Sequence, residues 1–130
     1  MKKNCQKLLQ DHLDFACKKA DVPIGTYKVR WMGKVKRYKS MKDGYFIQIQ
    51  NFISLNKAKL SKDNTNIRYY FRCVEFENSV EPLFEISKWT PTCGNEDNSV
   101  VIWRSDNPKK FNGTFISRLM FALNFVKLKM

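Results

Sequence analysis

The chain has 130 residues and a net charge of +12, with 24 lysines and arginines against 12 acidic residues. A hydrophobic fraction of 43% supplies one core, which excludes intrinsic disorder, and the length suits a single domain over residues 1–130. The positive charge favours an anionic partner such as nucleic acid, a membrane surface or an acidic protein.

The N-terminal segment predicts an amphipathic helix over residues 4–20. Apolar side chains recur at helical spacing from Cys5 to Ala20, and His12 lies among them. We interpret His12 as a packed core histidine. The helix ends before Pro23, because proline disfavours helical backbone in the preceding residue. No apolar targeting segment opens the chain, so an intracellular protein, nuclear or cytoplasmic, is expected.

The middle of the chain predicts five short strands. Alternating apolar and basic residues predict the first over residues 26–39, with Trp31 directed into the core. Asp43 and Gly44 predict a hairpin turn into the second strand. The other four strands are expected over residues 45–53, 67–76, 82–89 and 99–104, with loops over 54–66 and 90–98 between them.

The C-terminal segment predicts a second helix over residues 115–127, with Thr114 as its N-cap. Nearly every face is apolar, which favours deep burial or, in part, contact with a protein partner. The helix is too short, and too interrupted by Arg118 and Asn124, to span a membrane.

This element order predicts an α+β fold, with a small antiparallel β-barrel of five strands flanked by N- and C-terminal helices. Residues 26–104 resemble an OB-fold in strand order, although residues 77–82 leave no room for the helix that the OB-fold usually carries there. Residues 27–35 are instead similar to the first strand of phosphotyrosine-binding domains of the pleckstrin-homology superfold. That resemblance implies an interaction module for phosphoinositides or an acidic peptide.

Residues 27–45 combine basic side chains with aromatic rings. Basic side chains on a strand neutralise phosphates, and exposed rings stack on unpaired bases. The alternative interpretation gives the segment a core-facing apolar side and a solvated basic side. The first interpretation predicts a non-catalytic module that binds DNA or RNA, with single strands preferred. The predicted contacts are Lys28, Arg30, Lys34, Lys36, Arg37 and Lys39 for phosphates, with Tyr38 and Tyr45 for stacking.

No catalytic or metal-binding motif is found in the sequence. The four cysteines lack the spacing of a zinc site, and no glycine-rich phosphate loop or nucleophile elbow occurs, so neither an enzyme nor a cofactor or metal is expected. Trp89 and Trp103 are expected to pack together or into the core. A small subunit of a nucleoprotein complex is the remaining alternative.

Overall fold

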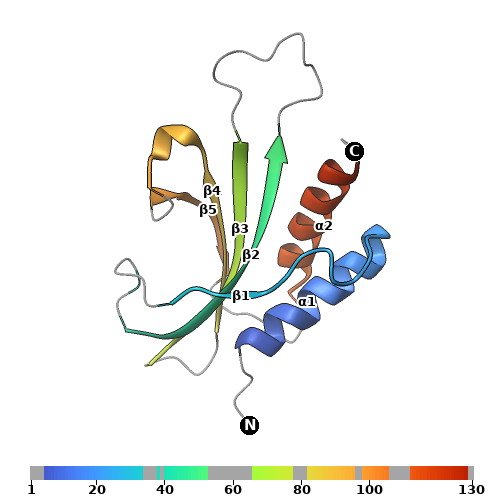
Figure 1. Ribbon diagram of the computed structural model, residues 1–130. Helices are drawn as coiled ribbons and strands as arrows, with labels where there is room; N and C mark the ends of the chain where they lie inside the picture. The colour runs from blue at the N-terminus through green and yellow to red at the C-terminus, as the bar shows by residue number, and fades with distance from the viewer. Residues whose placement is uncertain are drawn as a thin grey trace.

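A computed structural model describes residues 5–33, 38, 40–52, 66–77, 82–95, 98–105 and 112–128. Two α-helices and five strands make up the described fold, and both helices lie on one side of the sheet (Figure 1). The elements in chain order are α1 (Cys5–Ala20), β1 (Arg30–Trp31), β2 (Met41–Phe52), β3 (Asn66–Phe76), β4 (Leu83–Trp89), the short 3-10 turn η2 (Pro91–Cys93), β5 (Val100–Ser105) and α2 (Gly113–Leu128).

The strands form one antiparallel sheet in the order β1-β2-β3-β4-β5, which confirms the α+β class. The sheet does not close into the predicted barrel, because β1 and β5 remain its two edges. Closure requires the first strand to pair with the last. A first strand of two residues offers little edge for such pairing, and α1 and α2 cover one face of the open sheet instead.

The first strand is much shorter than the predicted range of 26–39. Gly33 has φ +73, a left-handed conformation that extended backbone cannot continue through. The predicted hairpin turn at Asp43 and Gly44 is also wrong, since both residues lie inside β2 and pair with β3. A Cβ at position 44 would lie 2.9 Å from the Met32 sulfur, so a larger residue there would require the Met32 side chain to move.

The core lies between the sheet and the two helices. The buried side of α1 consists of the eight residues that the helical spacing selects, from Cys5 to Ala20. His12 is fully buried among them, 4.6 Å from the ring of Phe84 between centroids. Its Nδ1 lies 2.8 Å from the Leu8 carbonyl, and its Nε2 accepts the Asn112 amide at 2.9 Å. The predicted packing role of His12 is confirmed.

Helix α2 differs from its prediction at both its start and its outer face. Its cap is Asn112, not Thr114, because the Asn112 side-chain oxygen accepts the Phe115 amide at 2.9 Å. The inner face is buried, but Phe121 is 74% exposed, so the helix is not covered all round. Among the described residues, no helix combines the length and apolar character that crossing a membrane would need.

Candidate nucleic-acid interface

Trp31 stands at the β1 edge of the sheet with 66% of its surface exposed. Its indole Nε1 donates a hydrogen bond of 3.0 Å to Asp43 Oδ1, which holds the side chain against β2. The same carboxylate oxygen accepts the Gly44 amide at 2.9 Å. The prediction that Trp31 points into the core is therefore wrong, and the chain presents a tethered, solvent-exposed aromatic ring.

Two of the predicted phosphate-binding residues lie at the same edge of the sheet as Trp31. Lys28 and Arg30 are both exposed, the first just before β1 and the second within it. Because both side chains are exposed, their charges reach solvent at this edge. The other four predicted residues, Lys34, Lys36, Arg37 and Lys39, lie outside the described residues.

Tyr38 is buried, with 7% of its surface exposed. Its hydroxyl donates a hydrogen bond to the fully buried carboxylate of Glu85, and its ring packs against Phe76 and Val74. A ring enclosed in this way has no free face for a base. The prediction that Tyr38 stacks on nucleic acid is therefore wrong. Tyr38 instead supplies one of the hydrogen-bond donors that the buried Glu85 carboxylate requires.

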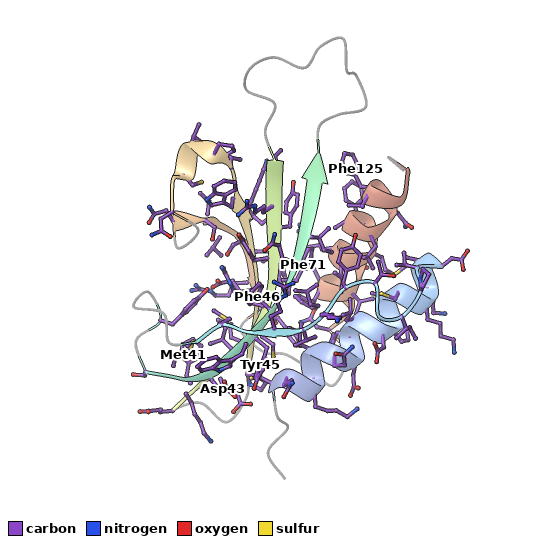
Figure 2. All side chains as sticks on the ribbon, viewed as in Figure 1. Met41, Asp43, Tyr45, Phe46, Phe71 and Phe125 are labelled. Carbon is purple, nitrogen blue, oxygen red and sulfur yellow. The ribbon has the colours of Figure 1, made fainter. Side chains whose placement is uncertain are left out.

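Tyr45 takes an intermediate position. It is the register partner of Trp31 across β1 and β2, and it packs on the main core near α1, as the lower part of Figure 2 shows. Burial, and next the nearby carboxylate of Asp43, raise the pKa of its phenol above the usual value. The side chain is half-buried, so Tyr45 supports the exposed Trp31 more than it offers a stacking surface of its own.

A row of charged side chains crosses the sheet on the face opposite the helices, hereafter the second face. The register aligns one residue from each strand, and the row contains three arginines, one aromatic residue and one acid: Arg30, Phe46, Arg72, Glu85 and Arg104. Arg30 and Arg104 are exposed at the two ends of the row, and Glu85 is fully buried. The row carries more positive than negative charge from one edge to the other.

Glu85 is the centre of this row. Arg104 donates two hydrogen bonds to its Oε2, from Nε at 3.1 Å and from Nη2 at 2.6 Å. Arg72 Nη1 lies 3.6 Å from Oε1. Arg72 also donates to Ser87 at 2.5 Å. Because two arginines and a tyrosine surround one carboxylate, the acid is compensated inside the protein and does not oppose an anionic ligand.

A further arginine and aromatic pair extends the second face toward η2. The guanidinium of Arg68 lies 4.5 Å from the ring centre of Trp89, and Trp89 Nε1 donates to the Gly94 carbonyl at 3.2 Å. Trp103 points to the helix side instead, where its ring centroid is 6.1 Å from that of Phe115. The two tryptophans therefore pack separately, and only Trp103 belongs to the main core.

Sequence reasoning missed this row because its members are far apart in the chain. The available signal was the alternation of Arg68, Tyr70 and Arg72 in β3, which places polar side chains on the strand face away from the core.

Within the described residues, no three potential metal ligands come together. Comparison of the chain with models of protein families, with curated proteins and with solved structures gives no match.

Proposed function

We propose that the protein is a non-catalytic module that binds nucleic acid, with single strands preferred. The observation that carries the proposal is the exposed ring of Trp31, held by Asp43 at the β1 edge, where Lys28 and Arg30 are exposed on the other side of the same segment. An exposed aromatic ring on a sheet stacks on an unpaired base, and adjacent cations neutralise its phosphates. Double-stranded nucleic acid keeps its bases stacked on one another, which favours single strands here.

The arginine row begins at the same β1 edge but on the second face, whereas Trp31 lies on the helix side with its register partner Tyr45, so a nucleic-acid strand would have to pass around this edge to meet both. Arg30 begins the row at the β1 edge and Arg104 ends it at the β5 edge, so a backbone lying across the second face meets positive charge at both ends. The net charge of +12 adds long-range attraction. Trp31 takes the stacking role first expected of Tyr38, and the basic residues 34, 36, 37 and 39 stay in the proposal as predictions.

The test is fluorescence anisotropy of labelled single-stranded DNA, single-stranded RNA and duplex, titrated with protein over a salt series. With about four to seven phosphates contacted, the logarithm of single-strand affinity should fall with log salt at a slope of roughly −3 to −5. Trp31→Ala should weaken binding by about 1–3 kcal/mol, or roughly 5- to 150-fold, at unchanged slope. Arg30→Ala should reduce the slope by about 0.7.

The matched control is Ile24→Ala, which removes an apolar side chain that is 65% exposed in the turn after α1. It should leave affinity unchanged. Equal losses in Trp31→Ala and Ile24→Ala would refute the stacking role of Trp31. Absence of binding at low salt would refute the proposed function as a whole.

A further inference from the structure

An apolar groove runs between α2 and the β3–β5 part of the sheet. It has a volume of about 740 Å³, within the range of pockets that hold ligands in other proteins. Phe71 stands on the sheet wall and Phe125 on the helix wall (Figure 2). The other apolar residues that line it are Tyr69, Ile86, Ile102, Phe121 and Ala122.

Both rims of the groove expose large apolar side chains to water. Of the residues that line it, Phe121 on α2 is 74% exposed and Ile102 on β5 is 47% exposed. Covering such side chains is favourable, so leaving two of them exposed at one groove is costly for a monomer. Contiguous exposed apolar surface of this kind marks an interaction site.

The strand along the groove is also a sheet edge. β5 pairs with β4 on one side, and no described strand pairs with its other side. Proteins commonly protect such edges with proline, lysine or a bulge that twists the edge away. β5 has the sequence VVIWRS, with neither proline nor lysine, and it has a bulge at Ile102, where consecutive residues of β4 pair with Trp103 and Val101. On either side of that bulge its outer backbone groups can pair with an added strand, whose alternate side chains would point to the groove.

The charge around β5 and the groove indicates the kind of occupant. Among the described residues that line the groove, Arg118 on α2 is the only charged one, and it is exposed. A second copy of the chain would bring another net charge of +12 to a positively charged surface, which disfavours self-pairing. A strand added to β5 that alternates apolar and acidic residues would direct its apolar side chains toward the groove and its acidic ones toward the second face, where Arg104 of β5 is exposed.

We propose that an extended segment of an acidic partner protein pairs with β5 as a sixth strand and inserts its apolar side chains between α2 and the sheet. This site is separate from Trp31, because β1 and β5 are opposite edges of the sheet. The inference does not rest on nucleic-acid binding, and the protein would join a nucleic acid at one edge to a protein at the other.

The experiment is affinity selection from a displayed library of random linear peptides against the full chain, followed by binding measurements on the enriched peptides. We expect sequences in which apolar and acidic residues alternate. Phe121→Glu, at an exposed position, should weaken their binding roughly tenfold or more. Ile24→Glu adds the same charge at another exposed apolar position and should leave binding unchanged.

A second measurement tests the backbone pairing directly. N-methylation of alternate amides in an enriched peptide removes its strand-pairing donors, and in one of the two registers it should weaken binding roughly tenfold or more. Three results would overturn the proposal. They are the absence of enriched peptides, equal binding to wild type and Phe121→Glu, and a concentration-dependent dimer in sedimentation that Phe121→Glu abolishes.

Discussion

Replacement of Glu85 by glutamine should lower the free energy of unfolding by about 3 kcal/mol. Glu85 is fully buried, and Arg72, at 8% exposure, faces it with little access to bulk water. Removing one partner of a buried ion pair costs about 3–5 kcal/mol, because the remaining charge is left uncompensated. We expect the lower end of this range, because the Arg104 side chain is 48% exposed and water can solvate its charge once Glu85 is replaced. For a chain of 130 residues, this corresponds to a melting temperature lower by roughly 9–15 °C.

The assay is urea unfolding followed by tryptophan fluorescence and circular dichroism, with the denaturant slope unchanged between variants. The matched control is Asp11→Asn, which makes the same charge change in the exposed Lys7–Asp11 pair and should cost at most a few tenths of a kcal/mol. Arg72→Met in both backgrounds should show a coupling above about 1 kcal/mol with Glu85. A cost below about 1 kcal/mol for Glu85→Gln, or no coupling, would refute the role assigned to the row.

Two further predictions concern the cap of α2 and the thiols. Asn112→Ala should cost about 1–2 kcal/mol in urea unfolding, whereas Asn112→Asp keeps the oxygen that accepts the Phe115 amide and should retain most stability; equal losses would contradict the capping role. Iodoacetamide at neutral pH should modify Cys93 first by mass spectrometry, because hydrogen bonds from Thr90 lower the pKa of its thiol, and Thr90→Val should slow the reaction. Equal labelling rates at all four positions would contradict this, since burial raises the thiol pKa of Cys5, Cys17 and Cys73.

The elements with a strong local pattern were predictable. The helical period selects every buried residue of α1, because one apolar side of a helix packs on a core whatever the rest of the fold. Strands β3, β4 and β5 begin and end within about one residue of their predicted ranges. The loop predicted over 54–66 lies outside the described residues, apart from the first residue of β3, Asn66.

The alternation of the first strand correctly separates Tyr27 and Val29, which pack on the main core, from the exposed Lys28 and Arg30. It does not say which residues the core covers, so Trp31 is exposed at the edge although its register partner Tyr45 packs on the core. Tyr38 is buried by a partner 47 positions away, Glu85. Neither the exposure of Trp31 nor the burial of Tyr38 can be predicted from the few residues around it in the chain.

The arginine row shows why the candidate interface extends beyond the basic segment that the sequence emphasises. In the chain, Arg72 stands between Phe71 and Cys73, and neither neighbour indicates a charged surface. The antiparallel register brings Arg72 into line with Arg30 and Arg104, with Glu85 between them, on the face that the helices leave uncovered. Because each strand contributes one residue to the row, its charge follows from the register of the whole sheet. Shifting one strand by a residue would move its member to the core side, so the electrostatics of this face and the packing of the core depend on the same pairing.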